Sequence, residues 1–162
     1  MRTLIATALV AATAGVALAH HDGDIFRKGD MVVSHAYTFE NAKMAHSMRV
    51  YLTLANAGAA ADRLVSASVP FAGRVLFEGQ AIGTDGTLSV REIAAVAVEP
   101  GQTITFQPGA LWIELESVSA TFEHGEHFDM TLVFERAGAI EIEVEVEEAD
   151  EHGDDDHGKP AS

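Results

Sequence analysis

The stretch before the C-terminal tail alternates strictly between apolar and acidic residues. Ile140, Ile142, Val144 and Val146 are each followed directly by a glutamate. Because successive side chains of a β-strand point to opposite faces, this pattern predicts a strand with one face in a core and the other in water. The chain therefore has to supply a second layer of structure that packs on the apolar face of this strand.

Similar short segments recur through residues 31–146. Residues 48–54 also alternate, and strands are expected at 32–39, 49–55, 63–69, 74–77, 87–90, 93–98, 103–106, 111–115, 129–135 and 140–146. Gly, Pro, Asn and Asp separate them, as in residues 56–58, 99–101 and 107–109. Many short strands without a convincing amphipathic helix predict an all-β Greek-key sandwich or barrel. A short helical turn, if the chain has one, is expected in the alanine-rich residues 57–61 or 94–97.

The N-terminus has the features of a secretory signal peptide. Arg2 precedes an apolar run that ends in Ala17-Leu18-Ala19, which fits the small-residue pattern of a cleavage site. The run is too short and alanine-rich for a membrane-spanning helix, and no later segment is long enough. We therefore expect a cleaved peptide at 1–19, a His-containing leader at 20–30 and an exported, soluble protein. No cysteine lies near the cleavage site, so no lipoprotein anchor is expected.

Composition narrows the function further. The formal net charge of −15 argues against nucleic acid and anionic membranes as partners and favours cations or a basic protein. The sequence has no cysteine, which excludes disulfides, thiolate metal sites and cysteine nucleophiles. It also contains no G-x-S-x-G, no H-E-x-x-H and no glycine-rich phosphate loop, so no enzymatic activity is expected.

Met44, His46 and Met48 form the densest group of candidate metal ligands, with His35 as a further candidate on the preceding strand. A thioether prefers Cu(I), while imidazole binds Cu(I) and Cu(II), so this combination points to copper. Methionine is also a common filler of gaps in protein cores, which is the alternative interpretation.

The other histidines occur in pairs. Cleavage after Ala19 would leave His20 at the new amino terminus, where its α-amine and imidazole, with His21, favour Cu(II). His124 and His127 are three residues apart and would converge only in a loop or a helical turn. His152 and His157 lie in an acidic tail, residues 147–162, that is expected to be disordered. A solubilising tail and a flexible leader without metal are the alternatives for these segments.

Several motifs resemble the periplasmic copper chaperone PCu(A)C family. They are Y-L-T-L-A-N at 51–56, D-R-L-V-S-A-S at 62–68, E-P-G-Q-T at 99–103, Q-P-G at 107–109 and L-V-F-E-R-A-G at 132–138. The resemblance spans roughly residues 31–146. It implies a cupredoxin-like Greek-key β-sandwich that carries copper in the periplasm. The implied partner is a cytochrome oxidase subunit or another copper chaperone.

The ligand positions of the family carry other residues here. The resemblance places the first histidine at Phe77 or Glu78, an intermediate methionine near residues 88–90, and the His-x-Met motif at Trp112-Ile113-Glu114. Indole and carboxylate are not Cu(I) donors. Two interpretations remain open: the copper site has moved to the Met44, His46 and Met48 group, or the domain has lost copper and serves as a protein-docking module.

Overall fold

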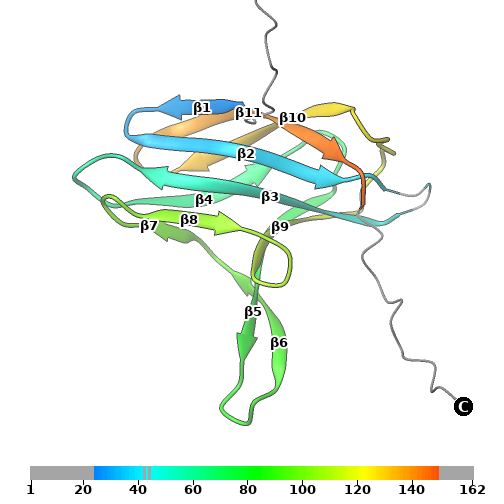
Figure 1. Ribbon diagram of the computed structural model, residues 1–162, viewed down its shortest axis with the longest axis horizontal. Helices are drawn as coiled ribbons and strands as arrows, with labels where there is room; N and C mark the ends of the chain where they lie inside the picture. Colours follow the sequence, from blue (N-terminus) through cyan, green and yellow to red (C-terminus); the bar gives the residue numbers. More distant parts are fainter. Residues whose placement is uncertain (1–23, 42, 44, 150–162) are drawn as a thin grey trace, which may run out of the picture.

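The computed structural model describes residues 24–41, 43 and 45–149, and this part of the chain consists of strands without any helix (Figure 1). Among these residues there is consequently no helix with the length and apolarity to cross a membrane. The strands are β1 (Ile25–Lys28), β2 (Met31–Phe39), β3 (Ser47–Asn56), β4 (Asp62–Ser68), β5 (Arg74–Ile82), β6 (Leu88–Ile93), β7 (Val96–Val98), β8 (Thr103–Phe106), β9 (Leu111–Glu116), β10 (His127–Phe134) and β11 (Gly138–Glu147).

The strands form one continuous sheet that folds over on itself. Its order is β6-β5-β9-β3-β2-β11-β10-β4-β7, with β1 added to β2 and β8 added to β3. All pairings are antiparallel except that of β11 with β2, which is parallel. The prediction of an all-β Greek-key β-sandwich is confirmed.

The two alternating stretches of the sequence both contribute to the core, on strands that flank β2 in the sheet order. Ile140, Ile142, Val144 and Val146 of β11 are all buried, and so are the apolar residues 48, 50, 52 and 54 of β3. Burying an aliphatic side chain of this size contributes roughly 1.5–3 kcal/mol to folding. The period of two read from the sequence therefore gave the core faces of both strands correctly.

Some elements differ from the expected ones. Ile25–Lys28, expected in the N-terminal leader, forms β1 beside β2, and Glu147, expected in the tail, is the last residue of β11. The strand expected at 74–77 continues to Ile82, where it forms a hairpin with β6. Both alanine-rich stretches are free of helix. β1 was missed because it is a short edge strand with little apolar periodicity.

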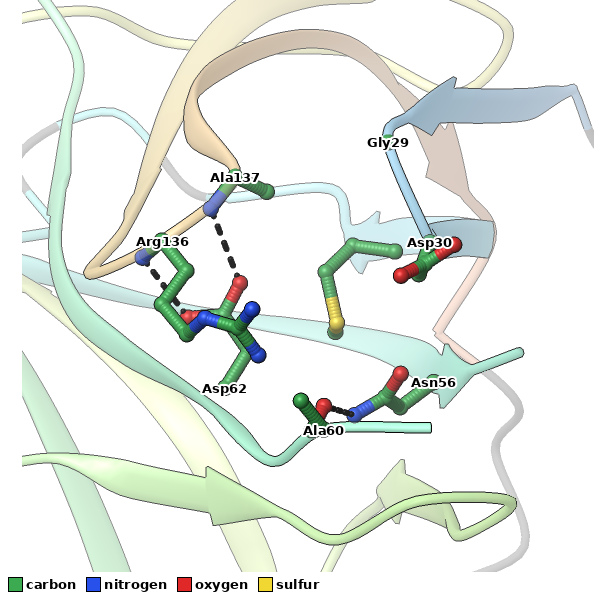
Figure 2. Close-up of a pocket in the computed structure, with 8 residues that line it drawn as sticks. Gly29, Asp30, Asn56, Ala60, Asp62, Arg136 and Ala137 are labelled. Carbon is green, nitrogen blue, oxygen red and sulfur yellow. Dashed lines mark hydrogen bonds between the residues drawn. The ribbon is translucent and has the colours of Figure 1, made fainter. Parts of the chain in front are cut away.

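A buried carboxylate closes the end of the sandwich where β4 begins. Asp62 is 5% exposed, and it accepts hydrogen bonds from the backbone N–H groups of Arg63 (2.7 Å), Arg136 (2.9 Å) and Ala137 (2.9 Å). Figure 2 shows the two bonds from the turn between β10 and β11. Burial alone would raise the pKa of Asp62, but the three N–H donors and the charge of Arg136 outweigh it and lower the pKa below 3.8.

Asn56 completes this end of the sandwich. Its side-chain amide donates to the carbonyls of Ala60 (2.8 Å) and Val98 (3.0 Å) and accepts from the N–H of Gly58 (3.0 Å). A cavity of about 140 Å³ lies between Asn56 and Asp62 (Figure 2). No buried side-chain nitrogen or oxygen of the described residues lacks a hydrogen-bond partner. The polar groups at this end therefore serve the fold.

Replacing Asp62 with asparagine is expected to lower the free energy of unfolding by about 1–3 kcal/mol at pH 7, because an NH₂ group then opposes backbone donors. The wild-type contribution is fully present above the ordinary pKa of an aspartate and is lost as the pH falls through the lowered folded-state pKa. Urea unfolding at neutral and acidic pH measures both effects. The exposed Asp129→Asn variant is the control, and equal urea midpoints for the two variants would contradict the assignment.

Candidate metal site

The structure places His46 and Met48 in different environments. Met48 is 5% exposed and packs in the hydrophobic core, whereas the side chain of His46 is exposed just before β3. Met44 lies outside the described residues. His46 and Met48 therefore do not form an open pair of ligands on one surface, and the core-filling interpretation describes the position of Met48.

An open cavity of about 250 Å³ nevertheless adjoins this loop. Thr38, Phe39, Glu40 and Asn41 of the β2 end and Ser47, Met48, Arg49 and Tyr51 of β3 line it. Met48 is the only sulfur-bearing residue among these lining residues. The loop that carries His46 thus borders a hollow with room for a ligand or a partner side chain.

His35 occupies an irregular position in β2. Its φ of +52° lies in the left-handed region, and the register between β2 and β3 shifts between Ser34 and Tyr37, as it does at a β-bulge. The exposed imidazole packs against Tyr37, with ring centroids 5.1 Å apart. Tyr37 in turn packs against Tyr51 at 5.2 Å. His35 is therefore part of an aromatic surface beside the cavity.

His124 and His127 lie on either side of a tight turn. The N–H of Glu126 donates to the carbonyl of Glu123 (3.1 Å), and His127 begins β10 with its Nδ1 3.6 Å from a carboxylate oxygen of Glu143. Both histidines are exposed. Within residues 24–41, 43 and 45–149, no three His, Asp or Glu side chains are placed to hold a metal together. His20, His21, His152 and His157 lie outside the described residues.

Segments that are distant in sequence meet at the end of the sandwich where β2 enters its loop to β3. The β2–β3 loop, the segment 117–126 and the end of β11 are joined by backbone hydrogen bonds. These run from Glu40 N–H to the Glu147 carbonyl (3.0 Å), from Asn41 N–H to Phe122 (3.2 Å), from Val118 N–H to His46 (3.2 Å), and from Gly125 N–H to Val146 (2.8 Å). The parts of the chain that carry or adjoin most candidate ligands are thereby anchored together.

A second polar cluster lies on the outer faces of β3 and β9. One carboxylate oxygen of Glu114 accepts hydrogen bonds from Arg49 Nε and Trp112 Nε1, both at 2.9 Å. The guanidinium carbon of Arg49 lies 4.7 Å from the centroid of the Trp112 ring, which is the geometry of a cation–π contact. The hydrogen bond to Glu114 raises the pKa of Arg49 against the opposing effect of its partial burial.

This cluster stands where the resemblance to copper chaperones places ligands. In that resemblance the His-x-Met motif is expected at Trp112 and Glu114, and Glu78 of β5 lies opposite Trp112 in the strand register. Trp112 is 2% exposed and Glu114 8% exposed. The indole N–H is a donor without a lone pair for a metal, and the carboxylate is hard and already bound to two donors. The chemistry of this donor set does not suit Cu(I).

Replacing Glu114 with glutamine is expected to lower the free energy of unfolding by about 1–3 kcal/mol and to shift the emission of Trp112, the only tryptophan. The neutral amide cannot match the charge-assisted bond to Arg49 or accept equally from the indole. Urea unfolding followed by tryptophan fluorescence measures both effects. In the matched control Glu92→Gln, the exposed pair with Arg74 is lost, with an expected change within about 1 kcal/mol. Equal destabilisation by both variants would contradict a special role for Glu114.

Solved structures with the same fold include PCuAC domains. The apo PCuAC domain from PmoF1 is 27% identical and superposes with a TM-score of 0.68, covering 78% of this chain and 100% of that domain. The copper-bound PCuAC domain from PmoF2 is 24% identical, with a TM-score of 0.67 and coverage of 78% and 99%. Apo-DR1885 from Deinococcus radiodurans is 18% identical, with a TM-score of 0.59 and coverage of 93% and 97%.

The similarity confirms the cupredoxin-like PCuAC fold that the sequence motifs predicted. No curated protein sequence matches the chain. A family profile described as "Putative lipoprotein LpqE-like" matches residues 31–146, which include the candidate ligands His35, Met44, His46, Met48, His124 and His127. The chain belongs to this LpqE-like family of PCuAC-type domains.

Proposed function

We propose that this protein binds copper and passes it on at the end of the sandwich where the β2–β3 loop, residues 117–126 and the end of β11 meet. The observation that carries the proposal is the set of backbone hydrogen bonds that anchors these segments to one another. PCuAC-type domains such as that of PmoF2 bind copper, which supports copper as the cargo. The net charge of −15 favours capture of a cation.

His46 and Met44 of the β2–β3 loop are the proposed primary ligands. A thioether and an imidazole suit Cu(I), and the adjoining cavity leaves the ion accessible to a recipient protein. His124 is carried by the segment anchored beside this loop, and the sequence that bears His152 and His157 follows the end of β11. His35, His127, His20 and His21 are proposed as secondary ligands, chiefly for Cu(II). Met48 supports the loop from the core.

The proposed setting is the periplasm, to which the signal peptide predicted at residues 1–19 would direct the chain. The proposed recipient is a copper centre of cytochrome oxidase or another copper chaperone, as the resemblance to the PCu(A)C family implies. Transfer requires an exposed site, because the recipient ligands have to reach the ion before the donor releases it. The exposure of His46 meets this requirement.

A second candidate is a docking module without copper. The observation that favours it is the Arg49, Trp112 and Glu114 cluster, whose groups bind one another at positions assigned to ligands by the resemblance. A domain of this kind would bind its partner protein equally well with and without copper.

Competition titration with a chromophoric Cu(I) chelator tests the first proposal on the mature chain. The Met44→Leu/His46→Gln variant is expected to lose at least about tenfold in affinity, whereas Met48→Leu, which conserves core volume, keeps wild-type affinity. A chain truncated after Ala149 separates the contribution of the tail. Wild-type binding no tighter than that of the isolated tail peptide, or an unchanged affinity in the double variant, would refute the loop site and favour the docking function.

A further inference from the structure

The β5–β6 hairpin projects away from the body of the sandwich (Figure 1). Its outer half carries Ile82, Leu88 and Val90, which are 73%, 67% and 51% exposed. Ile25 and Val65 are the other large apolar residues that are exposed in the described part of the chain. Most of the exposed large apolar side chains thus gather on one small projection, which marks an interaction surface.

The strand register puts these side chains on one face. Ile82 lies directly opposite Leu88, and Gln80 lies opposite Val90. Residues two apart on a strand share a face, so Leu88 and Val90 point the same way, and Ile82 joins them across the hairpin. This surface, Ile82, Leu88 and Val90, is called the hairpin patch below.

The hairpin also offers backbone hydrogen-bonding groups. Within the described sheet, β6 is the terminal strand and pairs only with β5. Its sequence, residues 88–93, contains no proline, its two charged side chains are Arg91 and Glu92, and its register with β5 shows no bulge. Proline and bulges are common devices against strand addition at natural edge strands, and Arg91 and Glu92 have opposite charges, so the edge of β6 stays open to a further strand of matching register.

Charge indicates which strand can approach. Residues 74–93 carry two arginines against three acidic residues, whereas the whole chain has a net charge of −15. Two copies of the chain repel each other through their net negative charge, and the hairpin, where the opposite charges nearly cancel, adds little to this repulsion. Since the hairpin has no basic excess, it does not favour an acidic partner either.

We propose that β6 pairs antiparallel with β6 of a second copy about a two-fold axis at Val90. This register sets Val90 against Val90, Ser89 against Arg91 and Leu88 against Glu92, so that no like charges face each other. It also keeps the hairpin patches of both copies on the same side of the joined sheet, where they form one apolar surface. The contact is isologous, as closed dimers require.

The dimer is expected to be weak and reversible. One pair of six-residue strands buries less than the roughly 1,200 Å² typical of stable complexes. The dimer contacts are apolar side chains and backbone hydrogen bonds, which salt hardly weakens. Because both chains are acidic, salt should tighten the dimer by screening their repulsion. Association with a basic partner through the acidic surfaces would weaken with salt.

Sedimentation equilibrium of the full mature chain with a metal chelator tests the proposal, from about 10 μM to about 1 mM at low and high salt. Wild-type protein is expected to show a monomer–dimer equilibrium that is tightened by salt. Val90→Lys should weaken it at least tenfold, while Ile25→Lys, which changes an exposed apolar residue elsewhere, should leave it unchanged. Far-ultraviolet circular dichroism verifies that both variants fold.

A monomer throughout this concentration range would overturn the proposal, as would equal effects of Val90→Lys and Ile25→Lys. A dimer that weakens with salt would overturn it in favour of a charge-driven contact. Because the chelator removes copper, none of these results depends on the proposed copper site.

Discussion

The parallel pairing of β11 with β2 is the constraint on which the arrangement of this protein depends. Most neighbouring strands here are antiparallel, so their connections can be short turns. A parallel pair instead brings the C-terminal ends of two strands to the same edge of the sheet. Glu147, at the end of β11, therefore lies opposite Phe39, where β2 enters its loop to β3. That pairing brings the end of β11 beside the β2–β3 loop, which carries the primary ligands of the proposed copper site.

The two ends of the sandwich differ in how deeply their polar anchors are buried: Asn56 and Asp62 are buried at one end, whereas Asn41 is only half-buried at the other. At one end, the buried side chains of Asp62 and Asn56 form hydrogen bonds with the backbone of several segments. Displacing these segments would leave a buried charge or amide without its hydrogen-bond partners, which is costly. At the other end, backbone hydrogen bonds hold the β2–β3 loop together with the part-buried side chain of Asn41, which donates to the Ala120 carbonyl (3.1 Å) and accepts from the N–H of Phe122 (2.7 Å). The first end is thus suited to fix the fold, and the second to exchange a ligand.

Much of this fold was predictable because its strands carry a clear apolar period. The faces of β3 and β11 followed directly from residues 48–54 and 140–146. β1 was not predictable in the same way, since an edge strand of four residues gains its order from pairing with β2 rather than from its own pattern. The hairpin was underestimated for a related reason: Ile82 and Leu88 pair with each other beyond the core, where apolar burial gives no signal.

The candidate site was less predictable than the fold, because its contacts depend on strand order. Alternation alone placed Arg49 opposite in direction to Met48, but its bond to Glu114 needed the knowledge that β3 and β9 are neighbours. The alternation that predicts β3 also places Met48 on the core face of that strand. The short sequence distance between His46 and Met48 therefore suggested a pair of ligands that the fold separates. The contact of residues 117–126 with the β2–β3 loop likewise had no sequence signal.

The parallel exit of β11 has a practical consequence for anyone who purifies this protein. A group fused at the C-terminus is linked through residues 148–162 to Glu147, whose carbonyl accepts from the N–H of Glu40 where the β2–β3 loop begins. A C-terminal polyhistidine tag would therefore concentrate foreign imidazoles at the surface whose metal affinity is to be measured. With a removable tag, or with anion-exchange chromatography of the untagged acidic chain, metal bound by the tag is not counted as metal bound by the protein.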